Sequence, residues 1–323
     1  MNALLADART HFNRLLIELE QDRGTRETCS QVLACIREAL AFTKFRDADD
    51  MCRQFDAFYD MFMHMKPRMA IIQHYLDQLV ESHLRHSKDN LPALLEALQS
   101  DVDSAERDIA QRGKILAKNM AAALPNHSHI LIHSNSRSVR DALEAAARTY
   151  KKFDVIIAEQ EACRTLEIAR DLTRRKIPFV VVPEYMLGCI EMDITCMFIG
   201  GVTLKKDMHV IVDPGTKAVV SEMNVAHIPV YLLITTNKFS YWDTRIAHQT
   251  LKSVRTVADR EKTMSFERIK FSHDRLPLHQ VTHVVTEEGI FSPSSLEELY
   301  KGKLEEYRRL HKEITKRLDH RKH

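Results

Sequence analysis

The hydrophobic pattern of the chain changes at residues 124–126. Before this point apolar residues return every three or four positions, as at Leu15 and Leu19, and glycine is nearly absent, which is typical of amphipathic helices. After it, short β-branched runs alternate with helical segments, a pattern that indicates parallel strands covered by helices on both faces. We therefore predict an α/β protein with an all-helical N-terminal domain over residues 1–124 and a Rossmann-like, mostly parallel sheet domain over residues 125–323.

Seven segments of the second part are short and rich in β-branched residues, as buried strands are. We predict strands at His129–His133, Phe153–Ala158, Phe179–Val182, Cys196–Ile199, Val210–Val212, Val230–Ile234 and His283–Val285. The clearest crossover helices between them are predicted at Ser138–Tyr150, Ala162–Arg174 and Thr216–Ala226. A final charged helix is expected over Ser295–His323.

Composition and charge exclude several classes of protein. The 323 residues contain 47 Lys and Arg against 45 Asp and Glu, so the net charge of +2 gives no overall field for nucleic acid or a membrane surface. No window approaches the roughly eighteen apolar residues of a membrane span, and the N-terminus lacks the pattern of a signal peptide, so we expect a cytoplasmic protein. The six cysteines form no Cys-x-x-Cys pair, and we expect neither a metal nor another cofactor.

An anion site is predicted where the first strand gives way to a helix. The residues at this junction, Ser134-Asn135-Ser136-Arg137, would lie at a helix N-terminus, where free backbone N–H groups and the helix dipole favour a phosphate. Gly200-Gly201, Gly215-Thr216 and Lys238 follow other strands and are expected at the same sheet edge. For the glycines, a turn that requires positive φ is an equally good explanation. His133 could orient a ligand or activate Ser134, although burial inside the sheet is the commoner fate of such a histidine.

Several short motifs carry a family resemblance through their order and spacing. They are Asp22-Arg23-Gly24-Thr25-Arg26-Glu27, Lys66-Pro67-Arg68, His133-Ser-Asn-Ser-Arg137, Phe198-Ile-Gly-Gly201, Asp213-Pro-Gly-Thr-Lys-Ala-Val219, Asn237-Lys-Phe239 and Glu288-Gly-Ile-Phe-Ser-Pro-Ser294. From about residue 20 to about residue 300 the chain resembles the regulatory subunits of eukaryotic translation initiation factor 2B. Ribose 1,5-bisphosphate isomerases and methylthioribose 1-phosphate isomerases belong to the same superfamily.

The resemblance implies a phosphate site between the two domains. The loop Arg23-Gly24-Thr25 and Arg68 would bind one phosphate from the helical side, because a guanidinium offers paired donors to a phosphate edge. The residues from Ser134 to Arg137 would bind another, and Lys238 would close the site. For Arg23 and Arg26, surface ion pairs with Glu20 or Glu27 are an equally good interpretation.

Catalysis is not implied, because the chain departs from the isomerases at two positions. The cysteine and the aspartate that move a proton in those enzymes align with Ser134 and Val202. A serine hydroxyl is too weak an acid for this role and valine has no proton to give, so Ser134 is only a weak catalytic candidate. The resemblance also implies a homodimer formed through the Rossmann-like domains.

Three functions stay open at this stage. The first is a non-catalytic regulatory or sensing protein that binds a phosphorylated sugar or nucleotide. The second is an aldose-ketose isomerase, acting on a sugar 1-phosphate such as ribose 1,5-bisphosphate or methylthioribose 1-phosphate, that has replaced its acid and base. The third is a translation-associated scaffold with a translation factor as its partner, a hypothesis that follows from family alone.

Overall fold

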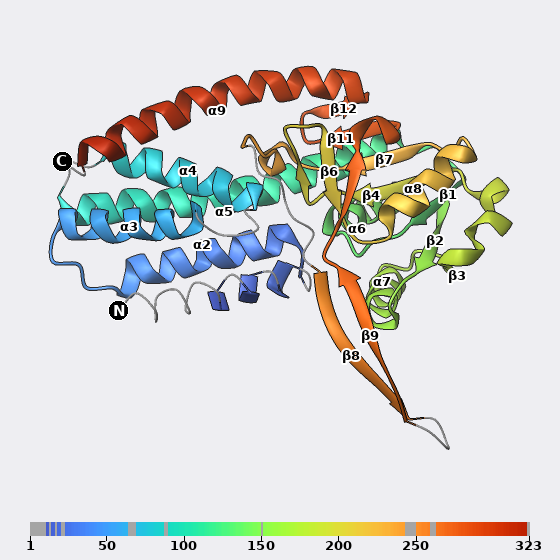
Figure 1. The fold of residues 1–323 in the computed structure, drawn as a ribbon. Helices are drawn as coiled ribbons and strands as arrows, with labels where there is room; N and C mark the ends of the chain where they lie inside the picture. Colours follow the sequence, from blue (N-terminus) through green and yellow to red (C-terminus); the bar gives the residue numbers. More distant parts are fainter. Residues whose placement is uncertain are drawn as a thin grey trace.

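The computed structural model describes residues 11–321 except positions 13, 17, 21–22, 64–68, 87–89, 150, 243–249 and 259–262. Its first part is a layer of helices that lie side by side (Figure 1). They are α2 (Thr25–Phe42), α3 (Ala48–Met63), α4 (Ala70–Arg85) and α5 (Leu91–Ala123). Their apolar faces enclose a core that includes Leu33, Phe55, Tyr75 and Leu98.

Helix α5 connects the helical layer to the sheet. Asn90 caps it, because its Oδ1 accepts a hydrogen bond from the Ala93 N–H at 3.0 Å, and a proline follows in the first turn. The first half of the helix contributes Leu94 and Leu98 to the helical core, and the second half packs Leu116 and Met120 beneath the sheet. One rigid element of 33 residues therefore holds both parts of the molecule in register.

The second part is a seven-stranded sheet in the order β12-β11-β7-β4-β1-β2-β3. Its strands are β1 (Ser128–Ile132), β2 (Phe153–Glu159), β3 (Phe179–Pro183), β4 (Cys196–Gly200), β7 (Val230–Leu233), β11 (His283–Thr286) and β12 (Gly289–Phe291). All neighbours are parallel except β12, which runs antiparallel to β11. The predicted class, an α/β protein with a helical N-terminal region and a mostly parallel sheet, is confirmed.

The crossover helices begin close to their predicted positions. Helix α6 spans Arg137–Ala147, α7 spans Ala162–Arg174 as predicted, and α8 spans Thr216–Val225. Short 3-10 turns follow three of the strands, at η1 (Glu184–Cys189) with η2 (Glu191–Asp193), η3 (Thr236–Lys238) and η4 (Leu278–Gln280).

One predicted strand of the parallel sheet was wrong. The segment 210–212 lies in β6 (His209–Val212), which pairs antiparallel with β5 (Thr203–Leu204) and β10 (Asp274–Pro277) in a separate three-stranded sheet. The physical reason is connection length. A parallel neighbour of β4 needs a crossover of a dozen or more residues, and the chain between β4 and β6 is shorter than that.

A long β-ribbon was not predicted at all. Strands β8 (Thr250–Ala258) and β9 (Thr263–Phe271) pair antiparallel and project from the body of the molecule (Figure 1). At the base of this ribbon the Arg268 guanidinium lies 3.1 Å from the carboxylate of Glu161.

The last helix, α9 (Pro293–Arg321), lies along both parts of the molecule (Figure 1). Leu296 and Tyr300 pack in the core of the sheet, whereas Ile314 packs in the helical core. No helix within the described ranges is both long and apolar enough to cross a membrane.

Candidate functional site

A cleft opens where the C-terminal ends of β1 and β4 meet the beginning of α2. Its volume is about 240 Å³. It is lined by Glu20, Gly24, Thr25, Arg26, Glu27, Asn135, Ser136, Arg137, Ser138, Cys163, Arg164, Glu167, Gly200, Gly201, Val202, Asp213 and Lys238. Ligands of parallel sheets bind at this edge of the strands, so the fold itself makes the cleft the candidate site.

Three helices begin at the cleft. Residues from the first turns of α2, α6 and α7 line it, and the residues that precede these helices, Gly24, Ser136 and Glu161, make no side-chain capping hydrogen bond. The first N–H groups of a helix have no acceptor within the helix. Three positive helix ends therefore face one cavity, which favours an anion there.

Helix α8 is different, because a side chain already caps its N-terminus. The carboxylate of Asp274 accepts hydrogen bonds from the backbone N–H groups of Gly215 and Lys217, both at 3.0 Å. Gly215 has a φ of 90°, and a Cβ atom there would press on the ring of His133. Gly215 and Thr216 thus serve the packing of the turn before α8 and lie outside the lining of the cleft.

The structure brings most of the residues predicted for the site together. Gly24, Thr25, Asn135, Ser136, Arg137, Gly200, Gly201 and Lys238 all line the cleft. Arg23 is exposed and lies outside the lining, as do the buried Ser134 and Thr216. Arg68 falls outside the described residues.

His133 and Ser134 are buried beneath the cleft, with Ser134 only 4% exposed. The imidazole of His133 lies 3.0 Å from the hydroxyl of Thr216 and 3.2 Å from the carboxylate of Glu184. The side-chain amide of Gln160 lies 2.9 Å from the same ring. These contacts are those of a histidine satisfied inside the sheet, the second of the two interpretations drawn from the sequence.

Arg26 and Arg137 of the cleft are held by carboxylates of α2 and α6. Asp141 of α6 accepts hydrogen bonds from Arg26 at 2.5 Å and from Arg137 at 3.0 Å. Arg137 also lies 3.4 Å from Glu27. For Arg26 the sequence suggested a surface ion pair with Glu20 or Glu27. Arg26 lines the cleft, and the partner that the structure gives it is 115 residues away along the chain.

Two ionisable groups of the cleft titrate near neutral pH. Burial, together with the nearby Arg26 guanidinium, lowers the pKa of Lys238 to about 8. The Lys238 ammonium donates a hydrogen bond to the carbonyl oxygen of Gly201 at 3.1 Å. Burial and the carboxylate of Asp213 raise the pKa of Glu20 to about 7. Groups with such pKa values are suited to bind or exchange protons at physiological pH.

Some residues of the cleft were not predicted as ligand-binding residues. They are Glu20, Arg26, Glu27, Ser138, Cys163, Arg164, Glu167, Val202 and Asp213. Cys163 and Arg164 begin the helix that follows β2, so the same strand-end rule that identified Ser136 could have found them. Asp213 precedes a proline and a glycine, a pattern typical of a turn, so the sequence gives no signal for its place in the cleft. No local signal brings Glu20 to the sheet, because this contact depends on the packing of helix on sheet.

Comparison with known proteins gives consistent results. The model of the Initiation factor 2 subunit family matches residues 21–293. The putative translation initiation factor eIF-2B subunit 2-like protein of Pyrococcus furiosus is 26% identical over 194 residues, which are 59% of this chain and 65% of that protein. Its counterpart in Pyrococcus abyssi is 27% identical over 195 residues, with the same shares. The chain thus matches slightly less than two thirds of the length of these relatives.

Solved structures share the fold over most of both chains. The translation initiation factor eIF-2B of Pyrococcus horikoshii OT3 has a TM-score of 0.66 at 18% identity, covering 87% of this chain and 97% of that one. A chain of the tetrameric eIF2B-beta2-delta2 complex of C. thermophilum has a TM-score of 0.67 at 16% identity, covering 91% and 95%. At such identities the similarity shows a common architecture.

Proposed function

The chain belongs to the Initiation factor 2 subunit family, as the order of its motifs indicated, and we propose that it binds a phosphorylated sugar or nucleotide in the cleft as a regulatory or sensing protein. The observation that carries this proposal is the convergence of three helix N-termini without side-chain caps, those of α2, α6 and α7, on one cavity. A phosphate group is the ligand that such N–H groups bind best.

The charges of the cleft indicate that its ligand is a phosphate ester of a polyol and not an inorganic anion. Four cations line it, Arg26, Arg137, Arg164 and Lys238, and they are balanced by the carboxylates of Glu20, Glu27, Glu167 and Asp213. The backbone N–H groups therefore supply the recognition of the phosphate. The carboxylates are acceptors, and the hydroxyl groups of a sugar or a ribose are matching donors.

A non-catalytic role agrees with the positions of Ser134 and Val202. Ser134 is buried outside the lining, and Val202 contributes an apolar side chain to it. Neither can exchange a proton with a ligand in the cleft. Binding without isomerisation is therefore the activity that we propose first.

An aldose-ketose isomerase acting on a sugar 1-phosphate is the second candidate. It is favoured by the pKa values of about 7 for Glu20 and about 8 for Lys238, two groups that line the same cavity and could move a proton between adjacent carbons. In that case they would replace the cysteine and aspartate of the family's isomerases.

A thermal-shift screen against sugar monophosphates, sugar bisphosphates and nucleoside monophosphates tests both candidates. Each ligand that stabilises the protein is then incubated with it and followed by NMR for conversion. We expect a saturable shift, no conversion, and a smaller shift in Arg137→Ala, because this variant keeps the backbone N–H groups but removes one cation from the cleft. Arg148→Ala, at the exposed end of the same helix, is the matched control. Conversion of a sugar phosphate would establish the isomerase, and absence of binding would favour the scaffold.

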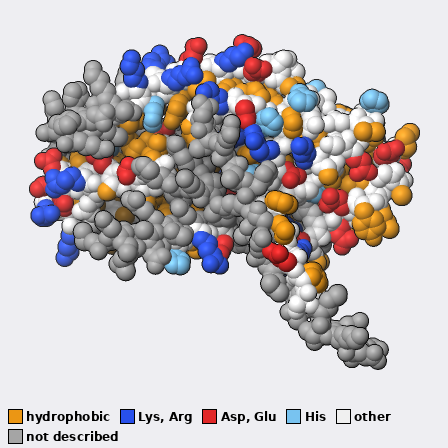
Figure 2. Space-filling model, in the orientation of Figure 1, with side chains coloured by type: hydrophobic (Ala, Val, Ile, Leu, Met, Phe, Trp, Pro, Cys, Tyr) orange, Lys and Arg blue, Asp and Glu red, His pale blue; other side chains and the backbone are white. Residues whose placement is uncertain are grey.

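We also propose that the protein pairs with a second copy through the sheet edge. Strand β3 is the outermost strand, and apolar side chains are exposed on it, on α7 and in the turns that follow it. They are Leu166, Val180, Val181, Tyr185, Met186 and Met192. Figure 2 shows hydrophobic side chains gathered at this end of the molecule. An unpaired edge with an apolar surface is typical of an interface between subunits.

A translation factor is the partner class that family membership favours, and the cytoplasm is the compartment that we expect for it. The scaffold function would be supported if the tagged protein captured such a factor from a native lysate, and if a variant that cannot bind the cleft ligand captured it as well.

A further inference from the structure

A second cavity, here called the α4–α9 groove, lies between these two helices and the loop that follows β7. Its volume is about 220 Å³. Within the described part of the chain no residue lines both the groove and the cleft. The groove is therefore a separate site, with its own chemistry.

Aromatic side chains form one wall of the groove. Phe239, Tyr241 and Trp242 contribute from the loop, and Tyr307 contributes from α9. The rings of Tyr241 and Tyr307 have centroids 4.9 Å apart and an interplanar angle of 33°. Aromatic faces carry negative charge density and attract cations.

The aromatic wall is preformed. The buried Tyr300 lies between the groove and the sheet core, with its ring 5.8 Å from Phe239 and 5.4 Å from Tyr241. Its hydroxyl donates a hydrogen bond to the carbonyl oxygen of Ser240 at 2.6 Å, which fixes the loop on α9. A ligand would thus find the rings in place and would not have to order them.

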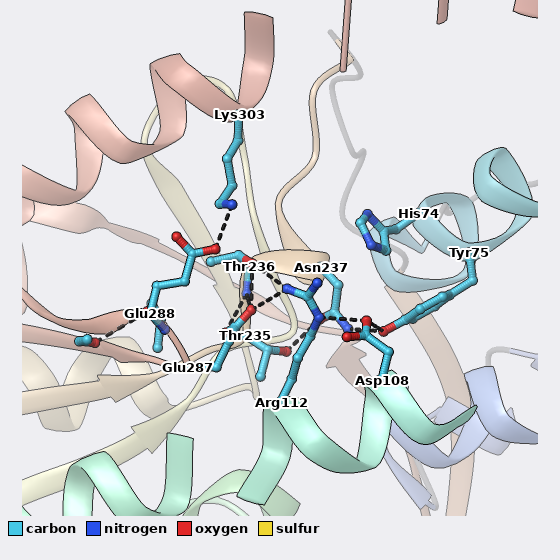
Figure 3. Close-up of polar contacts among 12 residues, drawn as sticks. His74, Tyr75, Asp108, Arg112, Thr235, Thr236, Asn237, Glu287, Glu288 and Lys303 are labelled. Carbon is cyan, nitrogen blue, oxygen red and sulfur yellow. Dashed lines mark hydrogen bonds and ion pairs between the residues drawn. The ribbon is translucent and has the colours of Figure 1, made fainter. Parts of the chain in front are cut away.

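The cations at the groove are already bound to carboxylates. Arg112 lies 2.7 Å from Asp108 and 2.6 Å from Glu287, and Lys303 lies 2.6 Å from Glu288 (Figure 3). They are therefore not available to hold a phosphate.

Negative charge is in excess around the groove. Among the described residues, the lining itself contains the cations Arg112 and Lys303 and the carboxylates Asp77 and Glu306. The excess comes from Asp108, Glu287 and Glu288, which lie outside the lining and pair with these two cations. Burial and the Arg112 guanidinium lower the pKa of His74 to about 4, so its ring adds no positive charge at neutral pH.

From the aromatic wall and the excess of carboxylates we infer that the α4–α9 groove binds a small organic ammonium ion. The methylated or alkylated ammonium group would lie against the rings of Tyr241, Trp242 and Tyr307, with Glu306 at the mouth of the groove. This site is independent of the function proposed for the cleft.

The fluorescence of Trp242 tests the inference, because it is the only tryptophan of the chain. Choline is titrated into the protein at constant ionic strength, and its neutral carbon analogue 3,3-dimethyl-1-butanol is titrated in parallel. We expect a saturable change with choline and none with the alcohol. An equal response to the alcohol, a saturable response to sulfate or AMP in place of choline, or no saturable response would each overturn the inference.

Two variants separate charge from shape. Glu306→Gln keeps the shape of the mouth and removes its charge, and we expect it to weaken choline binding about threefold. Glu305→Gln, the exposed neighbour that does not line the groove, is the matched control and should bind as the wild type does. Tyr307→Leu should weaken binding at least as much as Glu306→Gln. If Tyr307→Leu does not fold, the test depends on Glu306→Gln, which changes an exposed residue. Unchanged choline binding in that variant would contradict the inference that the negative charge of Glu306 helps to hold the ammonium group.

Discussion

Arg112 of α5 donates a hydrogen bond to Glu287, in the turn between β11 and β12, at 2.6 Å. The same carboxylate accepts hydrogen bonds from the N–H and the hydroxyl of Thr236, at 3.0 and 2.6 Å (Figure 3). This pair therefore joins a helix of the first part of the molecule to two loops of the sheet.

Removal of Arg112 is expected to be costly. The Glu287 side chain is only 6% exposed, so Arg112→Ala leaves a buried carboxylate without its cation. Breaking such a pair costs about 3 to 5 kcal/mol of the free energy of unfolding. Urea denaturation measures this loss. Lys301→Ala, at an exposed ion pair of α9, is the control and should leave the midpoint nearly unchanged. An equally small effect at Arg112 would mean that the pair contributes nothing to stability.

Gly200→Ala is expected to abolish ligand binding at the cleft. A Cβ atom at position 200 would overlap the Cβ and Oγ atoms of Ser136 and push away the residue that precedes α6. Overpacking of this kind costs about 1 to 3 kcal/mol. The double variant Gly200→Ala with Ser136→Gly removes the overlapping atoms and should restore the thermal shift. If the single variant keeps its shift, α6 is not part of the anion site.

The sheet side of the fold could be predicted from sequence because parallel strands are buried on both faces. Runs such as Val155–Ala158 are continuously apolar, and helix α7 was predicted with its observed ends. The ribbon of β8 and β9 could not be found in this way. Among the residues of β9 whose burial is described, Phe266, Glu267 and Ile269 are all exposed, and the charged Glu267 and Arg268 interrupt the apolar pattern there.

The candidate site could be predicted only in part, for a related reason. Ser136, Gly200 and Lys238 follow strands, and the strand-end rule places them at one edge. The contact of Arg26 with Asp141 depends on how the helical layer packs on the sheet, which no local pattern encodes. That packing brings Arg26 and Glu20 to the cleft.

The stability of the ligand-free protein should depend on pH through Glu20. Its pKa is raised on folding from 4.5 to about 7, so between these values the folded state holds a proton that the unfolded state has lost. This contribution is fully present below about pH 4.5 and disappears as the pH rises through 7. Urea denaturation of Glu20→Gln across pH 5 to 8 should therefore show a weaker fall in stability than the wild type. A parallel pH profile would place the pKa of Glu20 near its ordinary value.

The affinity of the cleft for anions should also fall as the pH rises. Lys238 loses its charge around pH 8 and Glu20 gains one around pH 7, and both changes oppose an anion in the cleft. Sulfate is the probe because its charge is constant in this range. Its stabilising effect, relative to chloride at equal ionic strength, should decrease between pH 6.5 and 9. In Lys238→Met the step near pH 8 should be absent. A constant effect in the wild type would separate these groups from the anion site.

The apolar surface at the β3 edge predicts the oligomeric state. Met192 is 92% exposed and Tyr185 is 84% exposed in the single chain. Exposure of apolar surface to water is unfavourable, and a second copy that covered these side chains would remove it. Met192→Glu introduces a charge into that interface, and we expect it to shift the protein from dimer to monomer in sedimentation equilibrium. Phe42→Glu is the matched control, because Phe42 is also exposed, at 84%, but lies at the end of α2 in the helical layer. Dissociation by Phe42→Glu alone would move the interface from the sheet edge to the helices.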